Sequence, residues 1–416
     1  MDLGIISFVI LIVIILIGFF FKINTGILAI AAALIVGRAG GISDGEIIEG
    51  FNVSLFVMIL GTTYLFSMAQ TNGTLHLFAR KVLGLVGHQT KLIPITIYFL
   101  AIGLSAIAGP IPVMALMTLL SVSLSADIGV SPLLMASLSV LGAGAGAVSP
   151  LSPTGILASE LIAAQEIYDI QIPYLINSIL GETLYAAVLY VTLGGYRIQN
   201  DSLCEESLPA FNREQKLTLA GIGTMAVLVL VFDINVGLAA FGISVILSIF
   251  KVAKEQDVIS NVPWGTLLLI SGIGIYMSLV IRLGGTKHLT DMLSGVLTTQ
   301  TAPSVMGVIA GVMSWFSSTS GVVIPTLFPM VGDLVEAGRQ VLHPVELISA
   351  ITNCSHAAGI SPMSTGGALT LAAFSSITRS DNETQRQLFI KLFIVSACGI
   401  IFLAIVSLLG VFRIVL

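Results

Sequence analysis

The sequence predicts an all-α polytopic membrane protein made of two inverted repeats, with about ten transmembrane helices, two re-entrant hairpins and two broken helices. The first observation is composition: of 416 residues, 56% are hydrophobic and only 9% are charged, with a mean hydropathy of +1.04. A soluble domain carries about 25% charged residues. The second is that interruptions rich in Gly, Ser and Pro recur at one offset inside long apolar segments. Such self-similarity indicates an internal duplication.

Composition and short motifs also exclude several classes of protein. The three cysteines, Cys204, Cys354 and Cys398, are odd in number and scattered, so no disulfide framework or metal cluster is expected. The sequence has no phosphate-binding loop, no dinucleotide fingerprint, no HExxH and no CxxC pair. We therefore predict that the chain is not an enzyme, needs no cofactor and binds no nucleic acid.

The first repeat is predicted to span residues 1–196. The uncharged run at 3–21 is long enough to cross a bilayer at about 1.5 Å per residue, and without a basic start or a cleavage site we interpret it as a retained helix. An amphipathic stretch at 75–86 carries Arg80 and Lys81. The other helices expected in this half cover 26–37, 53–71 and 173–195.

Two irregular segments interrupt this half. Apolar arms at 92–104 and 111–124 meet at Ser105-Ala-Ile-Ala-Gly-Pro110, and each arm is too short to span alone, so a re-entrant hairpin over about 92–124 is expected. A helix over 132–164 should break at Ser149-Pro-Leu-Ser-Pro153, because Pro lacks a backbone donor and clashes with the preceding turn. In hydrocarbon, opened backbone is tolerated only where protein covers it or where it lines a cavity.

A polar linker is expected at 197–216, followed by the second repeat at 217–416. Adding 212 takes Ser105 to Ser317, Pro132 to Pro344 and Gly155 to Gly367, and Tyr64 to Tyr276 and Gly73 to Gly285 in the same way. The segment around Asn24 matches Asn235 at an offset of 211. The second hairpin is expected at about 303–331, the second broken helix at 344–377 and the last helix from about 388.

An odd number of crossings in each half makes the two repeats inverted. Under this threading, the face that holds Arg80, Lys81 and the linker carries more Lys and Arg than the face that holds Arg38 and Arg282. The positive-inside rule then places the richer face in the cytoplasm. We expect a multi-pass protein of the cell inner (plasma) membrane with both termini extracytoplasmic.

The hairpin tips and helix breaks are the predicted binding site. Two such breaks in corresponding positions of two halves are the best pointer in a sequence to a transporter binding site. Half-helix N-termini attract anions, and carbonyls and hydroxyls are hard ligands for Na⁺. The predicted substrate-binding residues are Ser105, Ala106, Ser152, Thr154, Ser317, Ser318, Thr319, Asn353, His356, Ser364 and Thr365, and the predicted cation-binding residues are Ser105, Gly109, Ser149, Pro150, Ser317, Gly321, Ser361 and Pro362. For any one of these serines, simple packing between membrane helices is an equally good interpretation.

Ionisable residues within the apolar segments are few. No Lys or Arg falls at the predicted midplane, so helix termini, hydroxyls and co-bound cations would meet an anion. His356 is predicted either to donate to a carboxylate or to bond a backbone carbonyl. An intramembrane carboxyl is a functional hypothesis by default, and Glu182 is the candidate for a coupling proton. Glu160 and Glu346 are expected near the membrane interfaces.

At these residues the sequence resembles the ion transporter superfamily, whose divalent-anion/sodium symporters carry Ser-Asn-Thr at the hairpin tips and Thr-Pro-type breaks. Here the second tip reads Ser317-Ser-Thr319, and the first keeps only Ser105. The closer likeness is to the MatC-type dicarboxylate (malonate) carriers. It is carried by Phe51-Asn-Val-Ser-Leu-Phe56, Met68-Ala-Gln-Thr-Asn-Gly-Thr74, Leu104-Ser-Ala-Ile107 and Gly146-Ala-Val-Ser-Pro-Leu-Ser-Pro-Thr-Gly155.

The resemblance implies a secondary transporter that carries a small dicarboxylate of the malonate or succinate type, coupled to Na⁺ or H⁺. It also implies a homodimer with an elevator-like motion, in which the first two helices of each half form a fixed scaffold. A cation/proton antiporter or another anion exporter on the same fold is the nearest alternative. A passive channel is the alternative from a different class.

Overall fold

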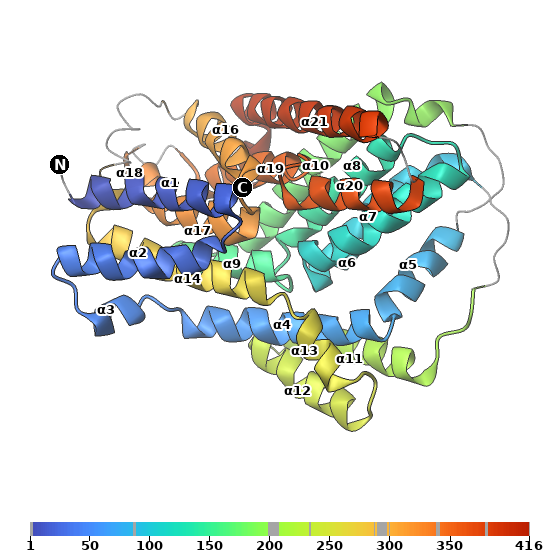
Figure 1. Ribbon diagram of the computed structural model, residues 1–416, viewed down its shortest axis with the longest axis horizontal. Helices are drawn as coiled ribbons and strands as arrows, with labels where there is room; N and C mark the ends of the chain where they lie inside the picture. The colour runs from blue at the N-terminus through green and yellow to red at the C-terminus, as the bar shows by residue number, and fades with distance from the viewer. Residues whose placement is uncertain are drawn as a thin grey trace.

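The computed structural model describes residues 3–85, 89–198, 208–232, 234–286, 288, 298, 300–337, 342–378 and 382–415. Within these ranges every regular element is a helix (Figure 1). The first repeat contains α1 (Leu3–Phe21), α2 (Thr25–Ala39), α3 (Asp44–Ile48), α4 (Val53–Thr71), α5 (Thr74–Gly84), α6 (Ile93–Ala108), α7 (Pro110–Asp127), α8 (Pro132–Ala147), α9 (Pro153–Ala163) and α10 (Gln171–Thr192). The second contains α11 (Arg213–Leu230), α12 (Val236–Ile249), α13 (Glu255–Asn261), α14 (Trp264–Arg282), α16 (Ala302–Trp315), a π-helical turn η3 (Thr319–Val323), α17 (Ile324–Leu327), a 3₁₀ turn η4 (Phe328–Met330), α18 (Val331–Ala337), α19 (Pro344–Ala358), α20 (Thr365–Thr378), α21 (Asn382–Leu408) and a 3₁₀ turn η5 (Val411–Arg413).

The predicted polytopic membrane fold is confirmed. In the described part of the chain, six helices are long and apolar enough to cross a membrane, and five shorter helices are also apolar. The exposed sides of these helices are apolar as well: Phe20 and Phe21 at the end of α1 and Ile35 in α2 are each more than two-thirds exposed. A side chain of this kind is stable at such exposure where hydrocarbon takes the place of water.

The repeat is visible in the order of the helices, and it corrects the register of the duplication. Both α4 and α14 have 19 residues, and Gly73 and Gly284, which follow them, both have left-handed backbones with φ of 73° and 75°. The offset in this region is therefore 211, not the 212 predicted from Tyr64 and Gly73. Because the positive φ favours Gly at the helix end, Gly284 and not Gly285 is the equivalent residue.

Two pairs of glycines show that the repeats pack with pseudo-two-fold symmetry. A Cβ on Gly272 of α14 would lie 2.1 Å from the carbonyl oxygen of Gly26 in α2. At the equivalent crossing, a Cβ on Gly61 of α4 would lie 2.4 Å from the carbonyl oxygen of Gly237 in α12. In each repeat, the second helix therefore packs against the long helix of the other repeat. At these crossings the two backbones approach so closely that only Gly fits.

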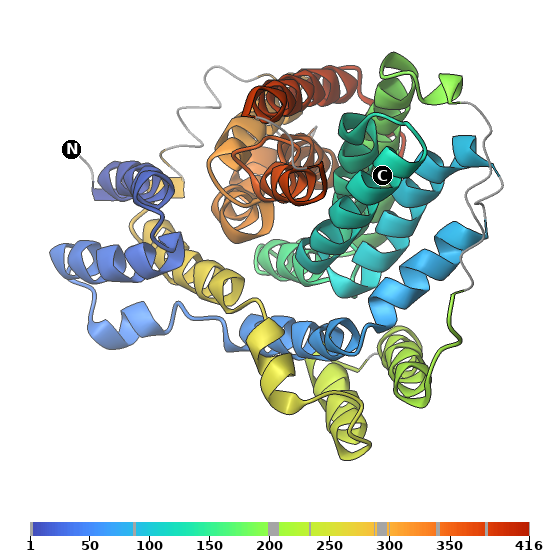
Figure 2. The same ribbon diagram turned by 45° about the vertical axis from the view of Figure 1, so that its right-hand side comes forward.

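The helices form two groups. In Figure 2, α1–α4 and α11–α14 lie in an arc along one side of the hairpins, the broken helices and the last helix of each repeat. We call the arc the scaffold and the remaining helices the central unit. The largest continuous apolar core extends from the hairpins and both broken helices into α4, α12 and α14 of the scaffold. The arc includes the third long helix of each half (α4 and α14) as well as the first two helices that the resemblance implies, and motion between the two groups stays a prediction.

Three predicted boundaries were wrong. The arm predicted to end at 104 continues to Ala108, because Ala and Ile support a helix until Gly109, whose φ is 85°. With the turn before it, this arm is long enough to span. Helix α11 begins at Arg213, inside the predicted 197–216 linker, because Asn212 and Gln215 form a capping box. Helix α21 begins at Asn382 instead of 388. Residues 199–207 of the linker lie outside the described residues.

Candidate functional site

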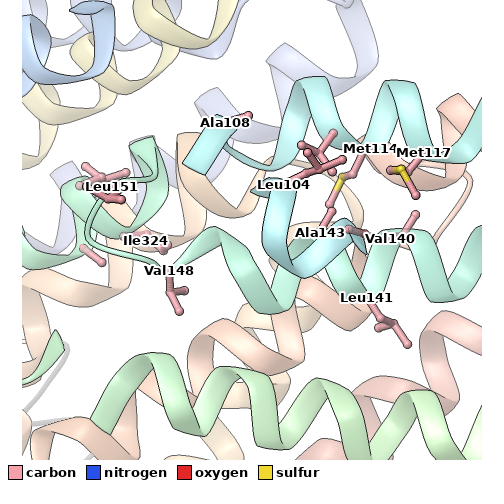
Figure 3. Packing of buried hydrophobic residues seen from close by; sticks show 14 of the residues in the cluster. Leu104, Ala108, Met114, Met117, Val140, Leu141, Ala143, Val148, Leu151 and Ile324 are labelled. Atoms are coloured by element: carbon pink, nitrogen blue, oxygen red, sulfur yellow. The ribbon is translucent and has the colours of Figure 1, made fainter. Parts of the chain in front are cut away.

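The first hairpin tip lies against the first helix break. A Cβ built on Gly109, between α6 and α7, would be 3.0 Å from Cδ of Pro153 and 3.8 Å from Oγ of Ser152. The side chain of Ser152 is fully buried, and its hydroxyl has no hydrogen-bond partner in the described protein. Figure 3 shows Leu104 and Met114, which flank Gly109 in sequence, in one apolar cluster with Ala143 of α8. The predicted juxtaposition of tip and break is therefore present in the first repeat.

The hydroxyl of Ser105 anchors the first tip. It donates to the carbonyl oxygen of Ala143 in α8 at 2.6 Å, and Ser105 is fully buried. The next residue, Ala106, packs against α8, with its backbone nitrogen 2.9 Å from where a Cβ of Gly146 would stand. In this conformation Ser105 is a structural contact between the tip and the helix before the break.

The second tip is held in an equivalent way, but by different residues. The carbonyl oxygen of Ser355, which is equivalent to that of Ala143, accepts from Ser314 at 2.9 Å and from Thr319 at 3.2 Å. Ser317, the predicted equivalent of Ser105, instead donates to Met313 within its own helix at 2.7 Å. Ser314 was not predicted; only its position on the face of α16 toward α19 distinguishes it from Ser317.

The second hairpin has an irregular return arm. Helix α16 and the segment from Thr319 to Glu336 differ in direction by 118°. The hydroxyl of Ser318 accepts from the N–H of Gly321 at 3.3 Å and so caps the π-helical turn. Ser317, Ser318 and Thr319 are half-buried, unlike the fully buried Ser105. The tip that keeps the Ser-rich motif is also the more accessible one.

The two breaks have the same backbone structure. The hydroxyls of Ser149 and Ser361 each accept from the backbone N–H two residues later, on Leu151 and Met363, at 3.3 Å. A Cβ on Gly155 or Gly367 would lie 2.0 or 2.2 Å from the carbonyl oxygen of the serine in its own break. The half-buried Pro150 and the buried Pro362 each follow that serine. These residues form the opened backbone itself.

One hydrogen bond links the repeats at their irregular segments. The hydroxyl of Thr154, in the first turn of α9, lies 2.8 Å from that of Ser320 in the second tip, and both side chains are buried. The equivalent positions, Gly366 and Ala108, have no hydroxyl. Figure 3 shows Ile324, which follows Ser320 on the return arm, beside the first break. Thr154 was predicted from the sequence as a binding residue; Ser320 was not.

The second break lies close to α8. A Cβ on Gly366 would be 2.8 Å from a methyl group of Val140. Ser364 is buried beside this junction, whereas the next residue, Thr365, is exposed at the start of α20. Of the predicted substrate ligands, Thr365 is the one whose side chain is most accessible.

His356 lies where the broken helices cross. The Cβ position of Gly144 is 2.9 Å from Cβ of His356, and these two residues are equivalent in the repeat. Neither ring nitrogen of His356 has a hydrogen-bond partner in the described protein, and the side chain is buried. The predicted bond to a backbone carbonyl is therefore not formed in this conformation. Asn353 faces α10 instead, donating to the carbonyl oxygens of Ser349 at 2.8 Å and Asn177 at 3.4 Å.

The three carboxyls have different surroundings. Glu182, in α10, is fully buried, and neither oxygen has a hydrogen-bond partner in the described protein. Glu346, at the start of α19, is also buried, but both of its oxygens accept from Nε of Arg413 at 2.8 Å. Glu160 is half-buried near the end of α9. No group of three His, Cys, Asp or Glu in the described ranges is arranged to hold a metal ion.

A cavity separates the first hairpin from the scaffold. It has a volume of about 140 Å³ and lies between α4, α7 and the turn before α14; its lining is Thr63, Phe66, Ser67, Gln70, Ala108, Ile111, Pro112, Ala115, Asn261 and Pro263. The second hairpin packs directly on α14, with the Cβ position of Gly321 2.3 Å from a methyl group of Leu269, but a larger cavity of about 350 Å³ lies between this hairpin and α1. The two cavities differ in chemistry: the lining of the first includes Thr63, Ser67, Gln70 and Asn261, whereas the lining of the second is apolar except for Thr326.

The comparisons with known proteins agree with this architecture. Residues 1–147 match the family profile described as the dicarboxylate carrier protein MatC N-terminus. The resemblance to MatC-type carriers is confirmed over this region. The crystal structure of the YdaH transporter of Alcanivorax borkumensis has the same fold, with a TM-score of 0.58 at 12% identity over 88% of this chain and 87% of that chain. No curated protein matches the chain. Together these findings support a membrane transporter.

Proposed function

We propose that the protein is a secondary active transporter for a small dicarboxylate of three or four carbons, coupled to Na⁺ or H⁺. The main observation behind this proposal is that the first hairpin tip lies against the first break, and the second tip reaches the same break through the hydrogen bond between Thr154 and Ser320. The N-terminus of α9 points into this junction without a side-chain cap, so its backbone N–H groups favour an anion. The family that matches residues 1–147 is one of dicarboxylate carriers.

An alternating-access mechanism follows from the difference between the hairpins. In an inverted repeat, the two states exchange the environments of equivalent elements. The cavity beside the first hairpin has polar groups in its lining and the cavity beside the second hairpin is apolar, so we infer that the present conformation admits an anion from the end of α4 that holds Gln70. We assign that end to the cytoplasm by the positive-inside rule. A homodimer with an elevator-like movement of the hairpin unit in a plasma membrane completes the proposal.

Cysteine accessibility tests the direction of opening. Ile111, which lines the cavity, and Val323, its fully buried equivalent in the second repeat, are a matched pair. A membrane-impermeant thiol reagent should modify Ile111→Cys from the cytoplasmic side and leave Val323→Cys unmodified in this state. Modification of Val323→Cys alone would contradict the assignment.

Uptake into proteoliposomes tests the function. Labelled malonate and succinate are offered with an inward Na⁺ gradient, a proton gradient or neither, and saturable uptake driven by one gradient is expected. Flux that neither saturates nor responds to a gradient would indicate a channel. Proton-coupled cation exchange without anion uptake would indicate the antiporter.

A single hydroxyl tests the location of the site. Because the hydroxyl of Ser152 has no partner in the described protein, Ser152→Ala should leave stability intact while losing a ligand contact of about 1 kcal/mol, which raises KM roughly fivefold. Ser260→Ala, which removes an exposed hydroxyl bonded within α13, is the control. An unchanged KM in Ser152→Ala would argue against a site at the first break.

A further inference from the structure

The interface between α10 and α19 contains a buried row of polar side chains. From one end of α10 to its middle, Asn177, Ser178 and Glu182 lie on the buried face, and Ser349 and Asn353 lie on the facing side of α19. All five side chains are fully buried. Figure 1 shows α10 and α19 next to each other in the central unit. We call these five residues the α10–α19 row.

Most side-chain oxygens of the α10–α19 row accept no hydrogen bond from the described protein. Asn177 and Asn353 use their amide N–H groups, on the carbonyl oxygens of Phe412 at 2.9 Å and Ser349 at 2.8 Å. Their amide oxygens, the hydroxyls of Ser178 and Ser349 and both carboxyl oxygens of Glu182 have no partner in the described protein. Buried polar atoms in native proteins are almost always satisfied by protein or by water. A row of acceptors without protein donors is therefore a place for water and protons.

The fold does not require this row. The left-handed Gly194 and Gly410 end α10 and α21, so these helices align at an offset of 216, with Phe393 in place of Asn177 and Cys398 in place of Glu182. Leu141 of α8 stands in place of Asn353, and Ser349 keeps a serine, Ser137, as its equivalent. The pseudo-symmetric interface between α21 and α8 thus packs without an acid or an amide. A buried acid that packing does not need indicates a function of its own.

In the described part of the chain, no Lys or Arg pairs with Glu182. Tyr98 of α6, Tyr185 of α10 and Cys354 of α19 are titratable side chains in electrostatic contact with it. Helix α8 has no titratable residue, and α21 contributes Cys398, which lies near Tyr185. A carboxylate with neither a donor nor a cation would be costly in this interior, whereas the neutral acid fits it.

We propose that Glu182 holds the coupling proton and that water along the α10–α19 row connects it to the membrane face at the C-terminal turn. The row ends at that face, where Asn177 donates to Phe412 and Glu346 pairs with Arg413. The coupling role rests on the proposed function; the protonated acid and its path do not. One proton per substrate with a gradient of about one pH unit supports roughly tenfold accumulation.

Two measurements test this proposal. Dicyclohexylcarbodiimide, an apolar reagent for protonated carboxyls, should label Glu182 in the intact wild-type protein, and mass spectrometry should find Glu346 unlabelled because Arg413 donates to both of its oxygens. Labelling of Glu346 without Glu182 would overturn the proposal. This readout needs no substrate, so it decides the proton site even if neither malonate nor succinate is carried.

The second measurement is transport by Glu182→Gln. The variant should still exchange labelled for unlabelled substrate across the membrane, while accumulation driven by a pH gradient falls from roughly tenfold to about onefold. Glu160→Gln, which changes a half-buried carboxyl outside the row, is the control. Accumulation at the wild-type level in Glu182→Gln would overturn the coupling role, whereas absence of exchange in the wild type would count against the proposed function instead.

Discussion

The hydrogen bond between Thr154 and Ser320 allows a quantitative prediction about the rate of uptake. It joins the first break to the second tip at 2.8 Å, and both hydroxyls are buried. Thr154→Val or Ser320→Ala removes a bond with a net value of about 1 kcal/mol and leaves the other hydroxyl buried without a partner. Each single change should therefore raise the activation free energy of uptake by about 1–3 kcal/mol. The double variant should raise it by no more than the worse single change does.

A double-mutant cycle on kcat/KM for uptake measures this coupling. We expect an interaction energy of at least about 1 kcal/mol, equivalent to a departure from additivity of at least roughly fivefold. Thr154→Ser keeps the hydroxyl and should retain most of the activity, while Ser260→Ala should be additive with Thr154→Val. If the Thr154 and Ser320 changes were also additive, the bond would not contribute to the transporting protein and the argument for a site at this junction would fail.

Two further predictions concern stability. Gly272→Ala places a Cβ 2.1 Å from the carbonyl oxygen of Gly26, so α2 and α14 must separate. This should reduce the free energy of unfolding by about 1–3 kcal/mol and lower the melting temperature in detergent. Gly274→Ala, whose Cβ would enter open space, is the control and should leave the melting temperature unchanged. Arg413→Gln leaves the buried Glu346 without its cation and should cost about 1–3 kcal/mol, and adding Glu346→Gln to it should restore much of the melting temperature.

The features best predicted from the sequence are those that depend on the backbone chemistry of Pro and Gly. The breaks are predictable because Pro cannot donate and because Gly155 and Gly367 approach carbonyl oxygens more closely than any Cβ allows. The capping box formed by Asn212 and Gln215 can also be recognised in the sequence, and missing it placed the end of the linker too late. The register error had a similar origin: Tyr64 and Tyr276 align by residue type, but the left-handed Gly73 and Gly284 set the ends of the helices.

Side-chain partners could not be predicted in the same way. Ser314 and Ser317 have the same chemistry and lie three residues apart, and only the direction of α16 relative to α19 decides that Ser314 reaches Ser355. Ser320 was not among the predicted residues, and its bond to Thr154 depends on how the second tip lies against the first break. Tertiary contacts select among hydroxyls that local pattern treats as alike.

The symmetric and the asymmetric residues have separable roles. Ser149 and Ser361, which repeat in both halves, shape the two breaks, and nearby backbone N–H groups donate to their hydroxyls. Ser152, whose equivalent is Ser364, is an exception, because its hydroxyl has no partner in the described protein. Other unpartnered or cross-repeat polar groups occur in one repeat only: the pairs are Thr154 with Gly366, Ser320 with Ala108, His356 with Gly144, Asn353 with Leu141 and Glu182 with Cys398. A symmetric backbone allows two states of similar energy, because each repeat can adopt the arrangement of the other. Under our proposals, recognition of the anion and binding of a proton then fall to the positions where the two repeats diverge.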